Sequence, residues 1–229
     1  MARFLPHTFS DCTVDDDVHD IVILPCRSPY LHCRQPDNAE AKCCGRCLVR
    51  AISSELQLYH EHLIVGNIRF YLKKRSLLKF KDPPSSCKHI VWAKMYIYFV
   101  TPHCPSWIQC PYFARTLQVH QVLKSWKEAE ATTTKRLNNA YWKKPWLALD
   151  DSDAYSHPAG PSVTMYPNRP ASFIEFDVTD AVQNWNSGQA NHGLIVWATN
   201  ENIKGRSLRF ASNANKKYGH AFINVHCKM

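Results

Sequence analysis

Apolar and polar side chains alternate along many short stretches of this chain, and turn residues separate the stretches. Strict alternation places every second side chain on one face, as in a half-buried β-strand. The pattern predicts strands at residues 68–72, 76–80, 90–100, 114–122, 173–176, 193–197 and 207–210. We therefore expect a mostly antiparallel β fold.

One short segment has helical spacing instead. Its apolar positions would form one face of a helix: Val178, Ala181, Val182 and Trp185. Asp177 or Thr179 can cap this helix, because a side-chain oxygen accepts hydrogen bonds from the unpaired amides of a first turn. Gly188 ends it, since glycine readily takes a positive φ. The fold class predicted is all-β with one or two short helices.

The chain of 229 residues is long enough for one large β domain and a small appendage. No apolar run approaches the ~20 residues that a membrane-spanning helix needs. Ten cysteines indicate an oxidising compartment, so we expect a secreted, extracellular protein. Residues 1–6 do not form a signal peptide, and we interpret the sequence as a mature fragment or a truncated one.

Six cysteines crowd into the first 50 residues, which hold few apolar side chains: Cys12, Cys26, Cys33, Cys43, Cys44 and Cys47. Such a segment needs disulfides for stability, and six cysteines allow 15 pairings. A zinc knuckle using His32 is the alternative, which the adjacent Cys43–Cys44 disfavours. From Cys26 the spacing reads C-x6-C-x-x-P-x6-CC-x-x-C, which resembles the C-terminal half of a von Willebrand factor type C module. We predict such a module at residues 1–52.

Four cysteines remain in the larger part of the chain: Cys87, Cys104, Cys110 and Cys227. Cys104 and Cys110 are close enough in sequence to form a disulfide within one local loop. We therefore predict that Cys87 pairs with Cys227 across the domain, tying down the last strand, although three pairings of the four are possible.

Ordered motifs from residue 53 to residue 227 resemble the DNRLRE (disaggregatase-related) family, which is grouped with carbohydrate-binding modules. They are Arg75-x-Leu-Leu-x-Phe80, Trp126-x-Glu128, Phe176-Asp-Val-Thr-x-x-Val-x-x-Trp185, Gly193-Leu194, Asn200-Glu201 and Arg209-Phe210-x-Ser212. The resemblance implies a β-sandwich of jelly-roll type at residues 53–229, with residues 220–226 as its closing strand. A shorter version of the Phe176–Trp185 phrase also occurs in transforming growth factor β propeptides.

Charge is unevenly distributed. Residues 1–50 hold six Lys or Arg and seven Asp or Glu, whereas the rest hold 22 and 12. The excess of +9 therefore lies in the larger domain and favours an acidic partner, although many such residues are simply a solvated surface. The cysteine content disfavours nucleic acid, which leaves acidic polysaccharide, matrix glycan or acidic protein.

Loop aromatics and basic residues are the candidate binding residues, because sugar rings stack on aromatic planes and anionic groups pair with Lys or Arg. The aromatic candidates are Trp107, Tyr112, Trp142, Trp146 and Tyr155, and the basic ones are Lys73, Arg75, Lys143 and Lys144. Lys73 and Lys74 face opposite ways on a strand.

We expect Trp92, Trp185 and Trp197 in the core. Trp126 is expected to be structural, with Lys124, Lys127, Lys135 and Arg136 around it.

No motif of a known catalytic class is present, and nothing in the sequence brings Glu128, Glu130, Glu175 or Glu201 into a pair. Asp150, Asp151 and Asp153 could hold a structural calcium ion, but an acidic turn is the simpler interpretation; we expect no cofactor. The sequence thus favours a non-catalytic adhesion protein that binds acidic polysaccharide or matrix. A growth-factor-binding regulator and a purely structural matrix component are the alternatives.

Overall fold

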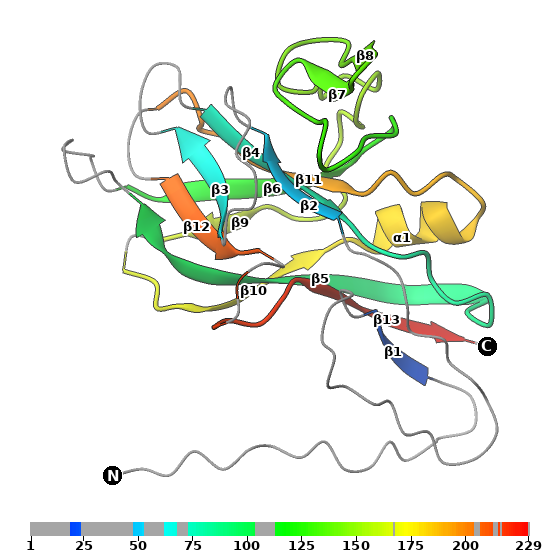
Figure 1. The fold of residues 1–229 in the computed structure, drawn as a ribbon. Helices are drawn as coiled ribbons and strands as arrows, with labels where there is room; N and C mark the ends of the chain where they lie inside the picture. Colours follow the sequence, from blue (N-terminus) through cyan, green and yellow to red (C-terminus); the bar gives the residue numbers. More distant parts are fainter. Residues whose placement is uncertain are drawn as a thin grey trace, which may run out of the picture.

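Antiparallel strands in two layers are the main elements of the part that the structure describes (Figure 1). The computed structural model describes residues 19–23, 48–52, 62–67, 73–103, 113–166, 168–203, 207–212, 215 and 217–228. Within these residues the main sheet runs in the order β1-β13-β5-β12-β3-β4-β11-β6-β9, with β10 added to β5 and β2 added to β4. The all-β, sandwich-like fold predicted from the sequence is confirmed.

The first layer is organised around one long strand, β5 (His89–His103). At Phe99, β5 pairs with β10 and with β12, so these two strands lie on opposite sides of it. At Met95, β5 pairs with β10 and with β13, which places β12 and β13 along the same side of β5. The remaining strands of this layer are β1 (His19–Ile23), β3 (His62–Asn67), β10 (Ser172–Asp177), β12 (Ser207–Ala211) and β13 (Phe222–Lys228).

The second layer joins the first where β3 pairs with β4, at Gly66 opposite Lys74. One curled sheet therefore supplies both layers (Figure 1). Its strands in the second layer are β2 (Leu48–Ile52), β4 (Lys73–Lys79), β6 (Arg115–Gln121), β9 (Val163–Met165) and β11 (Leu194–Ala198).

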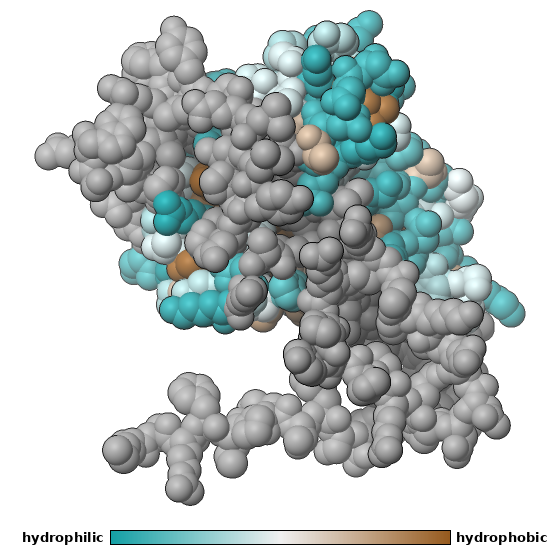
Figure 2. All heavy atoms as spheres, in the orientation of Figure 1, coloured by the Kyte–Doolittle hydropathy of each residue, from teal (hydrophilic) through white to brown (hydrophobic). Residues whose placement is uncertain are grey.

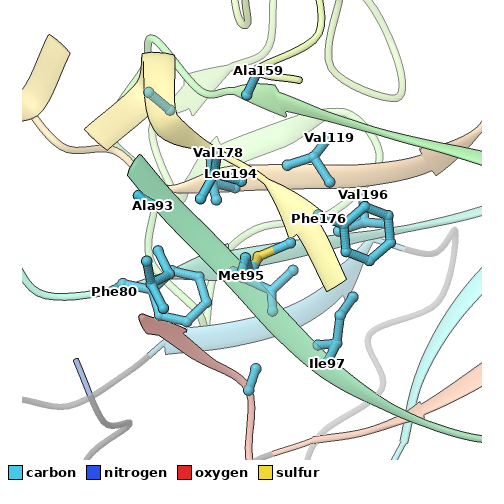
Figure 3. Close-up of a cluster of buried hydrophobic side chains, with 14 of the residues drawn as sticks. Phe80, Ala93, Met95, Ile97, Val119, Ala159, Phe176, Val178, Leu194 and Val196 are labelled. Atoms are coloured by element: carbon cyan, nitrogen blue, oxygen red, sulfur yellow. The ribbon is translucent and has the colours of Figure 1, made fainter. Parts of the chain in front are cut away.

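Apolar side chains from both layers fill the space between them (Figure 3). Alternation decides which ones point inward. Ala93, Met95 and Ile97 enter the core from β5, and Leu194 and Val196 enter it from β11. Each strand predicted at residues 76–80, 90–100, 114–122, 173–176, 193–197, 207–210 and 220–226 is present, whereas residues 68–72 lie outside the described part.

The helix α1 (Thr179–Asn186) packs against β5 at one end of the sandwich (Figure 1). Its predicted apolar face is buried, with Ala181, Val182 and Trp185 in the core. The prediction that Asp177 or Thr179 is the N-cap is wrong, because Val178 occupies that position and makes no side-chain cap hydrogen bond; Asp177, one residue earlier, accepts the amide N–H of Thr179 at 3.0 Å. Gly188 follows the helix with φ of +96°, and the predicted helix is confirmed.

A second apolar cluster lies on the outer face of the second layer. Residues 123–154, here called the cap, cross this face and carry the hairpin of β7 (Lys135–Leu137) and β8 (Ala140–Tyr141). Leu77 and Ile195 point outward from the sheet and meet Trp126 and Trp142 of the cap. The second layer is thus buried on both faces where the cap covers it.

The disulfide predicted between Cys87 and Cys227 is present, with the two Cα atoms 5.6 Å apart. Cys104 and Cys110 lie outside the described residues, as do the six cysteines of residues 1–52. Two strands within residues 1–52 are described: β1 pairs with β13, and β2 pairs with β4. The type C module stays a prediction.

Candidate anion-binding site

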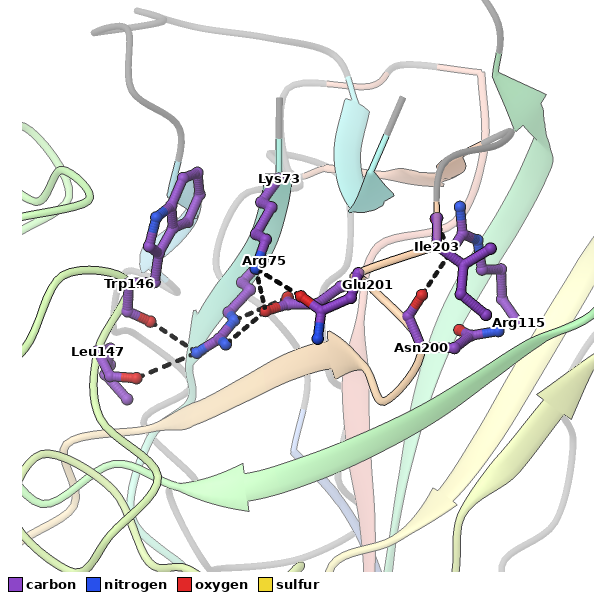
Figure 4. A network of polar contacts seen from close by, with 9 residues as sticks. Lys73, Arg75, Arg115, Trp146, Leu147, Asn200, Glu201 and Ile203 are labelled. Carbon is purple, nitrogen blue, oxygen red and sulfur yellow. Dashed lines mark hydrogen bonds and ion pairs between the residues drawn. The ribbon is translucent and has the colours of Figure 1, made fainter. Parts of the chain in front are cut away.

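Arg75, a predicted ligand-binding residue, is bound to a carboxylate within the protein (Figure 4). Its Nε donates to Glu201 at 3.0 Å, and its Nη2 donates to the other Glu201 oxygen at 2.7 Å. Its Nη1 donates to the carbonyl oxygens of Trp146 and Leu147 at 2.8 and 3.1 Å, and the guanidinium lies over the Trp197 ring. Arg75 therefore clamps the cap to the sheet.

Lys73 lies on the same face as Arg75, whereas Lys74 is buried on the opposite face, as strand alternation predicts. The Lys73 ammonium donates to Asn202 at 2.8 Å and lies 3.7 Å from Glu201 (Figure 4). The turn that carries Glu201 is also held by Arg115, which donates to the carbonyls of Asn200 and Ile203. Burial lowers the pKa of Arg115 to about 10.

Trp142, a second predicted binding residue, does not offer its ring to solvent. It is only 4% exposed, and its indole N–H donates to the Thr132 carbonyl at 3.0 Å. The expectation of an exposed loop position is wrong because Trp142 directly follows β8, so it points inward while its neighbour Tyr141, 65% exposed, points outward. Trp146 is half-buried, and it contributes its backbone carbonyl to Arg75.

Lys143 and Lys144 are exposed on the cap. Lys144 pairs with Asp150 at 2.7 Å, and its hydrogen bond holds the pKa of Asp150 at about 2. The amide of Lys143 donates to Asp153 at 2.8 Å, and Asp151 accepts from Ser156. The three aspartates proposed for calcium are thus bound within their own turn. No group of three His, Cys, Asp or Glu in the described residues is placed to hold a metal ion.

Tyr155 is half-buried, its ring stacks on His157, and its hydroxyl accepts from Gln189 at 2.6 Å. Trp107 and Tyr112 lie outside the described residues. Of the predicted binding residues, the structure brings Lys73, Arg75 and Trp146 together.

A row of aromatic rings lies on the outer face of the first layer. Trp92 stacks on His226, Tyr96 on Phe222, and Tyr98 on Tyr218, with centroid separations of 5.2, 4.9 and 4.9 Å. The core positions expected for Trp92 and Trp197 are therefore wrong: both are half-buried on outer sheet faces, because alternation gives the core to their neighbours Ala93, Val196 and Ala198. Trp126 and Trp185 are buried, as predicted.

Sequence reasoning missed a group of basic residues whose charges act on His192. The backbone fixes the position of this histidine. Gly193, with φ of +86°, lies so close to the end of β4 that a β carbon there would overlap the Leu78 carbonyl oxygen and come 3.0 Å from the Lys79 Cα. The Gly193 carbonyl accepts the amide of Val122 at 2.9 Å, and the His192 carbonyl accepts the Trp126 indole N–H at 2.7 Å. His192 therefore lies between the end of β4 and the start of the cap.

The positive charges of three residues from three segments act on this histidine and lower its pKa: Lys79 of β4, Lys124 at the start of the cap, and Arg136 of β7. We call these three residues and His192 the basic cluster. Arg136 is anchored by donating from Nη1 to the carbonyl and hydroxyl oxygens of Ser125, at 3.0 and 3.2 Å. Figure 2 shows a mainly hydrophilic surface over β7 and β8.

The basic cluster has no acidic partner among the described residues. The ion pairs found there involve Lys73, Arg75, Lys94, Lys127 and Lys144 instead. Burial and the charges of Lys79, Arg136 and Lys124 hold the pKa of His192 below its ordinary value. Like charges held together without a counter-ion favour binding of an anion.

No family model matches the chain, and no curated protein matches it. In the described part of the chain, no helix combines the length and apolar character needed to cross a membrane.

Proposed function

We propose that this protein is a secreted, non-catalytic adhesion module that binds an acidic polysaccharide of the extracellular matrix through the basic cluster. The observation that carries this proposal is that the charges of Lys79, Lys124 and Arg136 all act on His192, while none of the three has an ion-pair partner among the described residues. Three other cations on the cap or next to it have a carboxylate partner. Lys127 has Glu130, Lys144 has Asp150, and Arg75 has Glu201.

Repulsion within the cluster would fall when a ligand supplies negative charge. Hydrogen bonds between ionised partners are also stronger than those between neutral ones. Lys124 is exposed, whereas Lys79 and Arg136 are half-buried, so a ligand can reach the cluster and be partly shielded from water. A polymer with repeated carboxylate or sulfate groups fits this chemistry, and the charge excess of +9 would draw it towards the surface.

The acidic side chains support a binding role over hydrolysis. Glycoside hydrolysis typically uses two carboxyl groups that face each other across the substrate. Glu201 is bound to Arg75, Glu175 to Lys94 and Tyr96, and Glu130 to Lys127 and the Asn138 amide. These three carboxylates are thus held in three different local networks.

Affinity for immobilised polysaccharides tests the proposal. We expect the oxidised protein to bind a polyuronate or a sulfated polymer and to be released by salt, because screening weakens exposed charge pairs. Replacing Lys79, Lys124 and Arg136 together by alanine should weaken binding by roughly tenfold or more, which corresponds to about 1.4 kcal/mol.

The matched control removes the same number of charges outside the cluster: Lys88→Ala, Lys127→Ala and Lys144→Ala. All three side chains are exposed. An equal loss of affinity in both triple variants would show that net charge alone drives retention and would overturn the assigned site. No retention on any polymer would overturn the function and leave growth-factor binding by residues 1–52 as the next hypothesis to test.

A further inference from the structure

The hairpin of the cap presents one aromatic ring to solvent. Tyr141 of β8 is 65% exposed. The next residue, Trp142, is 4% exposed and packs in the apolar cluster beneath the cap, where its indole N–H donates to the Thr132 carbonyl. The exposed ring of Tyr141 therefore stands on a hairpin that is anchored to the rest of the protein.

An ammonium group lies over this ring. The Lys135 Nζ is 5.6 Å from the centroid of the Tyr141 ring, since the two residues are paired across β7 and β8. A cation is attracted to the electron-rich face of an aromatic ring, which keeps the two groups together. Lys135 has no ion pair among the described residues. An accessible apolar ring and a positive charge without a carboxylate thus lie side by side.

The pair of Tyr141 and Lys135 is continuous with the basic cluster, because Arg136 directly follows Lys135. The register of β7 against β8 shifts between Lys135 and Leu137, so two residues of β7 lie opposite one residue of β8. Such a bulge breaks the strict alternation of side chains between two faces, and alternation therefore does not separate Arg136 from Lys135. Arg136 is in turn bonded to Ser125, the residue after Lys124 of the basic cluster.

We propose that Tyr141 and Lys135 form a sugar-ring subsite next to the basic cluster: the Tyr141 ring stacks on the apolar C–H face of a sugar, and Lys135 pairs with the carboxylate or sulfate of that sugar. This inference rests on the function proposed above. Charge alone does not distinguish a polysaccharide from another polymer of equal charge density. The aromatic ring does, because it removes apolar surface from water only where the ligand has a ring face to offer.

Two tyrosines of nearly equal exposure allow a matched comparison. Tyr166 is 64% exposed, lies outside the cap and has no cation over its ring among the described residues. The variants are Tyr141→Ala, Tyr166→Ala and Tyr141→Phe, the last of which keeps the ring and loses only the hydroxyl. Substitutions at exposed positions have small effects on stability, and thermal unfolding of each variant checks that the fold is retained.

Two polymers separate the ring from the charge. Dextran sulfate carries its sulfate esters on sugar rings, whereas poly(vinyl sulfate) carries them on a hydrocarbon chain. Affinity for each should be measured by titration calorimetry at fixed ionic strength. A polyuronate measured in parallel distinguishes a carboxylate from a sulfate as the anionic group that Lys135 binds.

We expect Tyr141→Ala to bind dextran sulfate roughly three- to tenfold more weakly than the wild-type protein, the usual range for one aromatic contact. The same variant should bind poly(vinyl sulfate) as the wild type does. Tyr141→Phe and Tyr166→Ala should bind both polymers as the wild type does. Lys135→Ala should weaken binding to both, because it removes a charge that either polymer can use.

An equal loss on both polymers in Tyr141→Ala would overturn the stacking contact, as would a loss in Tyr141→Phe or Tyr166→Ala as large as in Tyr141→Ala. Unchanged binding of Tyr141→Ala to dextran sulfate, with binding still dependent on Lys79, Lys124 and Arg136, would overturn the subsite and leave the proposed function in place. Absence of wild-type binding to every polymer would instead overturn the proposed function itself.

Discussion

Positive side chains occur in two different settings in the described part of this molecule, and the difference is whether a carboxylate faces them. Arg75 and Glu201 lie 126 residues apart, and their side chains are 11% and 5% exposed. The guanidinium donates hydrogen bonds to the Glu201 carboxylate and to two carbonyl oxygens of the cap. Lys79 and Lys124 have no such partner among the described residues. Sequence composition does not distinguish the two cases, because the partner comes from a distant segment.

Glu201→Gln tests the clamp. It leaves the buried guanidinium of Arg75 without its counter-charge, and removing one partner of a buried pair typically destabilises by about 3–5 kcal/mol. We expect a loss of that order in the free energy of unfolding, measured by urea denaturation. Glu175→Gln is the control, because the Glu175 side chain is 50% exposed and its pair with Lys94 should contribute less than about 1 kcal/mol. Equal losses in both variants would contradict the structural role of the clamp.

At the scale of single elements, two neighbouring side chains of the cap hairpin differ in whether they are buried or exposed. Tyr141 and Trp142 are adjacent, yet the first is 65% exposed and the second is 4% exposed. Trp142 joins Trp126, Leu77 and Ile195 in the outer apolar cluster. The hairpin thus anchors the cap that carries Arg136 of the basic cluster.

Trp142→Ala and Tyr141→Ala form a matched pair of variants. Truncating the buried indole creates a cavity and leaves the Thr132 carbonyl without its donor, so unfolding should become easier by about 3–5 kcal/mol. Tyr141→Ala should change stability by less than about 1 kcal/mol, since surface substitutions have small effects. Denaturant unfolding monitored by circular dichroism measures both. Similar values for the two variants would show that the cap does not pack as described.

Most strands and the helix could be predicted from the sequence, because alternation and the Val178–Trp185 spacing are local signals. The orientation of aromatic side chains in β5 and in the short strands could not be predicted. Ile90 is buried although Trp92, two residues later, points outward, because the pairing with β13 shifts register between them, and alternation alone does not reveal such a shift. β7 and β8 have three and two residues, too few to establish alternation.

At the scale of the whole molecule, long-range contacts create both the disulfide and the basic cluster. Cys87 and Cys227 are separated by 140 residues. The basic cluster combines residues from β4, the start of the cap, β7 and the segment before Gly193, and their placement depends on the sheet order together with the packing of the cap. The sequence showed Lys124 and Arg136 near Trp126, but nothing in it connected them with Lys79 or His192.

Replacing Cys87 and Cys227 together by alanine should lower the free energy of unfolding by about 2–5 kcal/mol, because the crosslink restricts the unfolded chain across a long loop. Equilibrium unfolding of the oxidised wild-type protein and the double variant compares the two. Binding to polysaccharide should persist in the folded double variant, since the basic cluster does not include the disulfide. Equal stabilities would contradict a crosslink that contributes to the fold.

The position of β5 has a consequence for how the chain acquires this fold during synthesis. Every strand that pairs with β5 in the structure, β10, β12 and β13, is made after it. Until β13 leaves the ribosome, residues 89–93 of β5 have no partner from the described strands, and an unpaired apolar strand invites association with other chains. The nascent chain therefore carries this stretch of β5 without a partner from the described strands until β13 is made.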